Sequence, residues 1–215
     1  MMLRLPLKTR YLSAFVLFVA LACGSLALQA QSVNANQHPA AFIEAVTAQT
    51  LDVVKKDKAA QAGDRTAINN LVAQYVLPYV DFEKTTRLAA GRHWRDASAK
   101  QRADLVEAFK GTLIRTYSGS LSDVNNLATI NVAPFRGDEN ANDVVVRSSV
   151  VQKNGPAIAV DYRMENTPEG WKIYDLNAEG IWLIQNYRNQ SSQVVNQQGI
   201  DGLIKTLNNQ NMPAN

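Results

Sequence analysis

The sequence predicts an α+β fold in which helices pack on one face of a curved, four-stranded antiparallel sheet. In the first half of the chain, apolar residues recur three and four positions apart, which is the spacing of one helix face. In the second half they alternate with polar residues, which is typical of strands with one buried face. Both halves therefore contribute apolar side chains to one shared interior.

Two helices are predicted before residue 80. The first begins at His38-Pro39, because proline suits the first turn of a helix, and it ends before Gly63. Asp64 is the expected N-cap of the second helix, whose apolar residues form a single stripe. Pro78 is expected to end or bend this helix.

A brief helix and a long helix follow. The brief helix covers residues 81–88 and ends at Gly91. Ser98 and Gln101 stand three residues apart, which is the spacing of a capping box. They open a long helix whose apolar stripe consists of Leu105, Phe109, Leu113, Tyr117 and Leu121.

The second half of the chain is predicted to contain strands and then helices. Four strands span residues 128–135, 143–151, 157–165 and 171–176. Asn154-Gly155 is a strong hairpin turn dipeptide, and residues 167–170 form the next turn. Gly180 is expected to open a terminal helix that starts with Ile181, and a last short helix starts near Gly199.

Residues 1–30 have the layout of a secretory signal peptide, and residues 31–215 are expected to form a single domain with a polar C-terminal tail. Basic residues precede an apolar stretch from Tyr11 to Ala22, which is shorter than the roughly twenty residues of a membrane span. Cleavage is expected near Ala30, and an uncleaved anchor is the alternative. The only cysteine, Cys23, lies in this leader, so the mature chain has no disulfide.

The leader also carries the charge excess of the chain. The whole sequence has 22 Lys+Arg against 19 Asp+Glu, a net charge of +3. Arg4, Lys8 and Arg10 are removed with the leader, which contains no acidic residue, so the mature chain is close to neutral. A basic surface for nucleic acid is therefore not expected.

Residues suited to catalysis or metal binding are few. The two histidines, His38 and His93, have no carboxylate or thiol beside them in the sequence that would favour a metal or catalytic site. The sequence also has no P-loop, dinucleotide, Gly-x-Ser-x-Gly or His-Glu-x-x-His motif. A structural or surface role is expected for His93.

Four carboxylates remain as candidates for acid–base chemistry, and most have a structural explanation. Asp81 is an expected N-cap, and Glu83 follows it in the brief helix. Asp161 alternates with Arg163, which indicates a solvated cross-strand pair. Asp175 precedes the last helical region and is expected to cap or orient it. A small enzyme with Asp81 or Asp175 as its base stays open as an alternative.

Two long runs of the first half, from Tyr79 to Arg95 and from Ser98 to Tyr117, carry a recognisable pattern. Both runs resemble the signature of the MlaC family, also called the toluene-tolerance family. The likeness continues in the family's order over nearly the whole mature chain. The matching runs of the second half are residues 170–176, 179–181, 186–188 and 199–203.

The resemblance implies a soluble, monomeric periplasmic carrier that holds a phospholipid by its acyl chains in a deep apolar cavity. The fold would then be cone-shaped and NTF2-like, with the cavity between helices and sheet. The implied partners are the MlaD ring of an inner-membrane ABC transporter and the MlaA outer-membrane lipoprotein with its porin. The implied role is to maintain the lipid asymmetry of the outer membrane. No cofactor other than the lipid cargo and no catalysis are implied, and a non-catalytic envelope scaffold stays open.

Physical chemistry agrees with this implied role. A diacyl lipid has about thirty methylenes, and at about 0.8 kcal/mol each their exposure to water costs on the order of 20 kcal/mol. A carrier therefore needs a large apolar cavity and a polar exterior, but neither a nucleophile nor a metal ion.

Helix periodicity and strand alternation predict which residues contact the lipid. In the fourth strand Trp171 and Ile173 face one way and Tyr174 and Leu176 the other, so the inward side of that strand is ambiguous. His93, Trp94 and Arg95 are candidate surface residues for docking. The predicted lipid-binding residues are Phe82, Leu88, Phe109, Leu113, Tyr117, Val144, Val146, Val160, Tyr162, Met164, Trp171, Ile173 and Tyr174.

Overall fold

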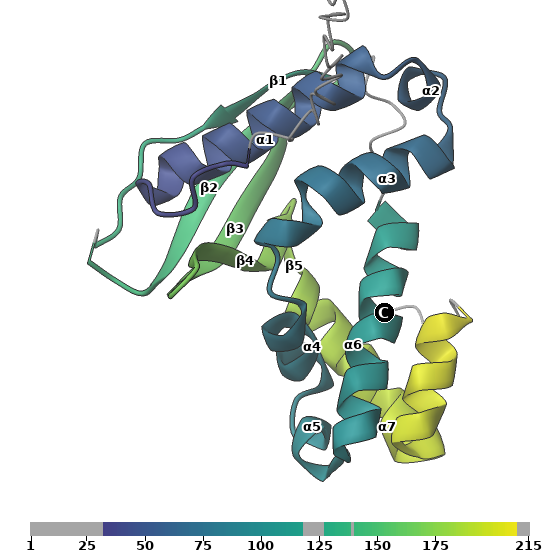
Figure 1. Cartoon of the computed structure of the whole chain (residues 1–215). Coiled ribbons are helices and arrows are strands. Elements are labelled where there is room, and N and C mark those ends of the chain that lie inside the picture. The colour runs from purple at the N-terminus through teal and green to yellow at the C-terminus, as the bar shows by residue number, and fades with distance from the viewer. Residues whose placement is uncertain (1–31, 118–126, 139, 210–215) are drawn as a thin grey trace, which may run out of the picture.

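The computed structural model describes residues 32–117, 127–138 and 140–209. The predicted signal peptide with Cys23, the position of Leu121 and the polar C-terminal tail lie outside these residues. Within the described residues, helices come first, an antiparallel sheet follows, and a long helix ends the chain (Figure 1). The predicted α+β class is therefore confirmed, whereas the NTF2-like outline stays a prediction.

The first helical region is divided at Asp57. The Asp57 carboxylate accepts a hydrogen bond from the amide of Ala60 at 2.8 Å and so caps a separate short helix. The prediction of one continuous helix up to Gly63 is therefore wrong. Asp64 caps the following helix as predicted, by accepting from the amides of Thr66 and Ala67. These helices are α1 (Pro39–Lys56), α2 (Lys58–Gln61) and α3 (Arg65–Tyr75).

The next helices begin at the expected caps. The Asp81 carboxylate accepts from the amide of Lys84 at 2.8 Å, and Ser98 and Gln101 exchange the two hydrogen bonds of a capping box. A short helix after Gly91 was not predicted. The elements of this region are the 3₁₀ turn η1 (Leu77–Tyr79) and the helices α4 (Phe82–Ala90), α5 (His93–Asp96) and α6 (Ala99–Tyr117).

The sheet has five antiparallel strands in the order β1-β2-β3-β4-β5, so the prediction of four strands is wrong. Strand β1 also ends at Val132, three residues before the predicted end. The strands are β1 (Leu127–Val132), β2 (Asp143–Gln152), β3 (Ile158–Thr167), β4 (Gly170–Ala178) and β5 (Ile181–Trp182).

The fifth strand replaces the predicted start of the terminal helix at Ile181. Glu179 and Gly180 have φ angles of 52° and 90°, and this left-handed turn sends the chain back along β4. Ile181 therefore pairs with Ala178, and the helix α7 (Leu183–Asn208) begins two residues later. Gly199 interrupts α7 with φ 71° and ψ −175°, so a last helical segment does start where the sequence predicts it.

Strand β4 contains a bulge at Tyr174. Arg163 on β3 lies opposite Asp175. The next residue of β3, Met164, lies opposite Ile173, so Tyr174 is the extra residue in β4. Simple alternation is therefore broken at this point of the strand.

The bulge resolves the ambiguity that alternation left in β4. Leu176 lies opposite Tyr162, whose side chain faces the interior, so Leu176 points inward together with Ile173. The prediction that these two residues face opposite ways is wrong, because the extra residue between them reverses the facing of the strand.

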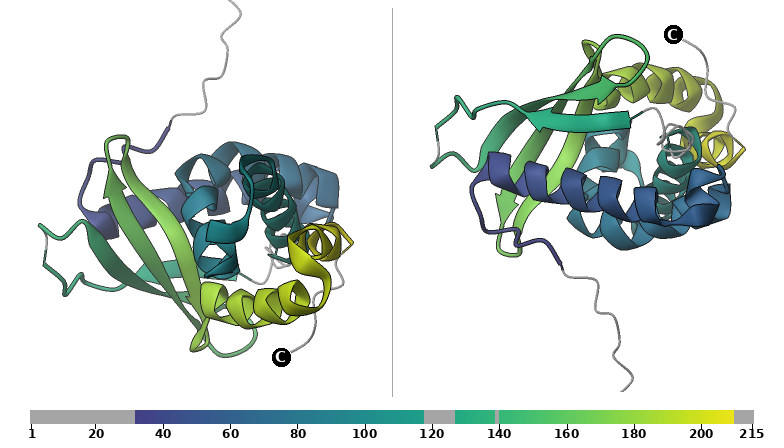
Figure 2. Two further views of the ribbon diagram at one scale, coloured as in Figure 1. Left: turned by 90° about the horizontal axis from the view of Figure 1, so that it is seen from below. Right: turned by 90° about the horizontal axis from the view of Figure 1, so that it is seen from above.

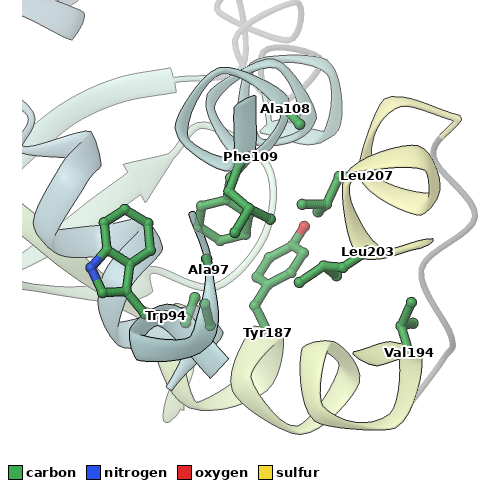
Figure 3. Close-up of a cluster of buried hydrophobic side chains, with 11 residues drawn as sticks. Trp94, Ala97, Ala108, Phe109, Tyr187, Val194, Leu203 and Leu207 are labelled. Carbon is green, nitrogen blue, oxygen red and sulfur yellow. The ribbon is translucent and has the colours of Figure 1, made fainter. Parts of the chain in front are cut away.

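The described residues form three separate clusters of buried side chains. Helix α1 crosses one face of the sheet (Figure 2). The sheet cluster lies between them and contains Phe42 and Met164. The α1–α3 cluster contains Val54 and Ile68. The helical cluster joins α4, α5, α6 and α7, and in it the rings of Phe109 and Tyr187 pack edge to face with centroids 4.8 Å apart (Figure 3).

Residues 32–38 form a strap over the turn between β3 and β4. The amide of Val33 donates to the hydroxyl of Tyr79 at 2.7 Å. The backbone amide and the indole nitrogen of Trp171 donate to the carbonyls of Ala35 and Gln37 at 2.8 and 3.1 Å. Gly170 permits this close approach, because a Cβ atom there would lie 2.6 Å from the carbonyl oxygen of Ala35.

Replacing Gly170 by alanine is expected to lower the free energy of unfolding by about 2 kcal/mol or more, as expected for a strained φ combined with a backbone clash. Gly63→Ala is the matched control, because Gly63 also has positive φ but no atom within 4 Å of the added Cβ. That control is expected to cost only about 1 kcal/mol. Urea denaturation measures both values, and equal losses would show that the strap does not constrain residue 170.

Candidate functional site

A cavity of about 580 Å³ lies where the three clusters meet. Helices α1, α3 and α6 form its walls on one side, and strands β1, β3, β4 and β5 form the other. The sheet cluster closes the inward face of the sheet beside Met164, whereas toward Val160 and Leu176 the same face is open to the cavity. One sheet face therefore supplies both a packed core and a hollow.

The lining of this cavity is mostly apolar, with Thr47, Thr50, Asn177 and Asn186 among its polar residues, and no Asp, Glu, Lys, Arg or His is found among its described lining residues. The hydroxyls of Thr47 and Thr50 donate to carbonyls one turn earlier in α1, each at 2.7 Å. The Tyr162 hydroxyl accepts from Ser148 at 3.4 Å, and burial raises the pKa of Tyr162 above its ordinary value. These hydroxyls are thus satisfied by the protein and leave a mostly apolar surface.

The volume of the cavity indicates whether it is a packing defect or a ligand-binding site. An enclosed empty cavity costs about 24 cal/mol per Å³, so 580 Å³ of empty space would cost on the order of 14 kcal/mol, as an upper bound for a cavity that opens at a mouth. A typical domain has a total stability of about 5–15 kcal/mol. The cavity is therefore too large to be a packing defect, and an apolar ligand suits it better than water, which would find few hydrogen-bond partners there.

Exposed apolar side chains mark the mouth of the cavity. The large hydrophobic residues that are exposed in the described part of the chain are Tyr117, Leu176 and Ile181, with relative exposures of 45%, 38% and 64%. All three also line the cavity. Because soluble proteins rarely gather exposed apolar groups without a function, this rim indicates where a ligand enters.

Asp175 fixes the elements beside the mouth. Its side chain is fully buried and forms an ion pair with Arg163 at 3.0 Å. Its other oxygen accepts from the amides of Leu176 and Ile184, each at 3.0 Å. Burial raises the pKa of the Asp175 carboxyl, and the Ile184 amide and Arg163 oppose that rise. The carboxylate thereby holds the start of α7 against β4.

The Asp175 contact agrees with its expected role of orienting the last helix. The cross-strand partner of Arg163 is Asp175, and Arg163 also stacks on the ring of Trp182 with 3.8 Å to the ring centroid. Asp161 lies opposite Arg147 on β2, so the solvated cross-strand pair expected there stays a prediction. The bulge aligns Arg163 with Asp175 on the neighbouring strand, whereas Asp161 lies opposite Asn177.

Lys84 ties α4 to the outer side of the sheet. Its ammonium lies 2.9 Å from Glu165 and 3.3 Å from Asp143, and 3.7 Å from the ring centroid of Tyr174. The Tyr174 hydroxyl donates to both oxygens of Asp143, at 2.8 and 2.9 Å. Burial and the Asp143 carboxylate raise the pKa of Tyr174, so the hydroxyl stays a donor at neutral pH.

The structure divides the predicted lipid-binding residues between the cavity and the packed clusters. Val144, Val146, Met164 and Trp171 are buried in the sheet cluster, and Phe109 is buried in the helical cluster. Leu88 and Tyr174 also lie outside the cavity lining. The residues that line it are Phe82, Leu113, Tyr117, Val160, Tyr162 and Ile173. Which of all these contact a ligand stays a prediction.

Several lining residues were missed by the sequence analysis. Val46 and Val54 on α1, Val72 on α3 and Ile114 on α6 line the cavity. Their apolar periodicity was visible in the sequence. Periodicity alone does not tell which part of an apolar helix face packs and which part faces a hollow, because that depends on where the elements diverge.

The predicted docking residues are corrected in part. His93 and Trp94 are buried, with relative exposures of 9% and 8%, because α5 packs against the helical lobe formed by α4, α6 and α7. The indole of Trp94 belongs to the helical cluster (Figure 3). Arg95 is exposed. Docking through the side chains of His93 and Trp94 would require their exposure, so these two residues are not surface candidates.

Neither a metal site nor a membrane span is found in the part of the chain that the structure describes. No group of three or more His, Cys, Asp or Glu side chains there could hold a metal ion. No helix there is long and apolar enough to cross a membrane.

The fold and the site together define an α+β protein built around an uncharged interior cavity with an apolar rim. Among solved structures, it is similar to a phospholipid-binding protein from Ralstonia solanacearum in complex with a phospholipid. The TM-score is 0.75 at 37% sequence identity, and the match covers 82% of this chain and 97% of that chain.

The sequence comparisons show the particular family. The model of the MlaC protein family matches residues 44–209, so the chain belongs to the MlaC family. It is 26% identical over 147 residues to the intermembrane phospholipid transport system binding protein MlaC of Haemophilus influenzae, a match covering 67% of this chain and 68% of that protein. It is also 26% identical over 174 residues to the toluene tolerance protein ttg2D of Pseudomonas putida, covering 80% of each.

Asp175→Ala is expected to lower the free energy of unfolding by about 3 kcal/mol, because it leaves a guanidinium and two amides without their buried acceptor. Asp161→Ala, on the adjacent strand, removes none of these contacts. It is expected to change the free energy of unfolding by less than about 0.5 kcal/mol. Denaturant titrations monitored by circular dichroism compare the two. A loss of similar size in both variants would contradict the assigned role of Asp175.

Proposed function

We propose that this protein is a soluble periplasmic carrier that holds a phospholipid by its acyl chains in the cavity. The single observation that carries the proposal is the uncharged cavity of about 580 Å³ whose rim contains the exposed residues Tyr117, Leu176 and Ile181. Family membership and the likeness to a structure that contains a phospholipid support it.

The physical requirements of such a carrier agree with the geometry. The apolar lining replaces water around the acyl chains, which removes most of their exposure cost. The polar head group would remain near the rim, where solvent is accessible. Both the release and the capture of the lipid would then occur at the rim, so the rim is the surface that a membrane partner must approach.

The proposed pathway follows from the family. The carrier would exchange lipid with an outer-membrane complex of an MlaA-like lipoprotein and a porin, and with the MlaD-like ring of an inner-membrane ABC transporter. The leader at residues 1–30 would export the chain to the compartment between these membranes. The proposed outcome is the maintenance of lipid asymmetry in the outer membrane.

The alternatives are less well supported. An envelope scaffold needs no interior cavity of this size. For an acid–base enzyme, Asp81 serves as the N-cap of α4, and Asp175 is enclosed by Arg163 and two amides and does not line the cavity. We therefore propose no catalytic role for either carboxylate.

Replacing Ile114 by tryptophan tests the proposal, because Ile114 lines the cavity but belongs to none of the three buried clusters. The larger side chain is expected to occupy cavity volume and to reduce bound phospholipid several-fold, on the order of the loss that a few unburied methylenes produce. Mass spectrometry of organic extracts from the purified protein measures phospholipid per chain.

Asn189→Trp is the control, because Asn189 is exposed on α7 and lies outside the cavity lining. It is expected to keep the wild-type amount of lipid. If the wild-type protein carries no phospholipid and takes none up from vesicles, the carrier function is wrong.

A further inference from the structure

The cavity shares one wall with a second hollow on the protein surface, which we call the groove. The groove has a volume of about 380 Å³ and lies between α4, α6 and the turn from β3 to β4. Val80 and Phe82 line both the groove and the cavity. These two side chains therefore form the partition between the two hollows.

Helix α6 runs past both hollows with the same face. Val106 and Lys110 line the groove, whereas Leu113, Ile114 and Tyr117 line the cavity. These positions are spaced by three and four residues, which places them on one side of the helix. The groove thus continues the direction of the cavity beyond Phe82.

The two hollows differ in chemistry. The groove is bordered by Asp81, Glu107, Lys110, Glu169 and Lys172, whereas no charged residue is found in the described lining of the cavity. All five of these charged side chains already have partners: Lys110 pairs with Glu107, Lys172 donates to a backbone carbonyl, Asp81 caps α4, and Glu169 accepts from the Thr167 hydroxyl. The groove is therefore bordered by charged residues, and the partition separates it from the apolar interior.

The side chain of Phe82 is not part of the hydrophobic core. It belongs neither to the three buried clusters nor to the partly buried residues packed against them. Its ring also forms none of the aromatic pairs found among the described residues. An aromatic ring that packs into no cluster but lines two hollows acts as a separator rather than as core.

The backbone on either side of this ring is fixed. Val80 forms a β-bridge with Ile173, and the Asp81 amide donates to the Ile173 carbonyl at 2.9 Å. The Asp81 carboxylate caps α4 through the amide of Lys84. Truncation of the Phe82 side chain would therefore open the wall, because the backbone is not free to move inward and close it.

We propose that the ring of Phe82 closes the cavity against the groove and thereby limits the length of acyl chain that the cavity accepts. This inference rests on the proposed function, since it assumes that acyl chains occupy the cavity. The side chain of Phe82 would then form the end of the cavity that faces the groove. Removal of the ring gives the tip of a longer chain the volume that the ring occupies at the end of the apolar lining.

The test compares two phosphatidylethanolamines, one with sixteen-carbon and one with twenty-carbon chains, offered as an equal mixture in vesicles to the purified mature protein. Mass spectrometry then measures the ratio of the two lipids bound. For Phe82→Ala we expect the ratio of long to short lipid to rise on the order of tenfold over wild type, because each further buried methylene favours binding roughly fourfold. Phe82→Leu is expected to raise the ratio of long to short lipid by less. This variant keeps the test possible if the alanine variant does not fold.

Phe82→Trp and Val106→Ala are the matched controls. The first keeps the wall closed, and the second enlarges the groove without removing the partition. Neither is expected to raise the ratio. The inference is overturned if the wild type binds both lipids and the alanine and leucine variants, folded by circular dichroism, keep the wild-type ratio. A wild type that binds neither lipid would instead reject the proposed function.

Discussion

An apolar cavity persists in water only if the elements around it cannot close on one another, because each wall gains free energy by collapsing onto the opposite one. In this protein, polar contacts outside the cavity hold the walls apart. Lys84 binds α4 to the sheet through Asp143 and Glu165, and Asp175 binds the start of α7 to β4. These contacts have directional geometry that collapse would break, so hydrogen bonds and ion pairs act together with the buried clusters to keep the hollow open.

The three buried clusters follow from the same constraint. A single merged core would fill the space between helices and sheet, whereas three clusters leave a hollow where they meet. Helix α1 takes part in two of them: Phe42 packs on the sheet, and Val54 packs on α3. Between these two anchors, Val46 and Thr50 face the hollow. The single continuous helix α1 thus bridges the cavity between the two clusters.

The sequence predicted those features that depend on local contacts. Asp64, Asp81 and Ser98 cap their helices as expected, because capping involves residues within one turn. The fifth strand was missed, since it depends on an unusual conformation at Glu179. The cavity lining was predicted only in part: Leu113 lines it, whereas Phe109, one turn away on the same helix, is core. That distinction depends on α7, whose Tyr187 meets Phe109 from far along the chain.

The bulge at Tyr174 affects how this chain can be aligned with its relatives. One extra residue inside a strand reverses the side to which every later residue of that strand points. An alignment with its gap one position away would therefore equate interior positions with surface positions, even where overall identity is high. Cross-strand partners give a safer correspondence, because Leu176 lies opposite Tyr162 however the intervening residues are counted. In this family, interior positions of β4 are thus better compared by strand pairing than by residue order.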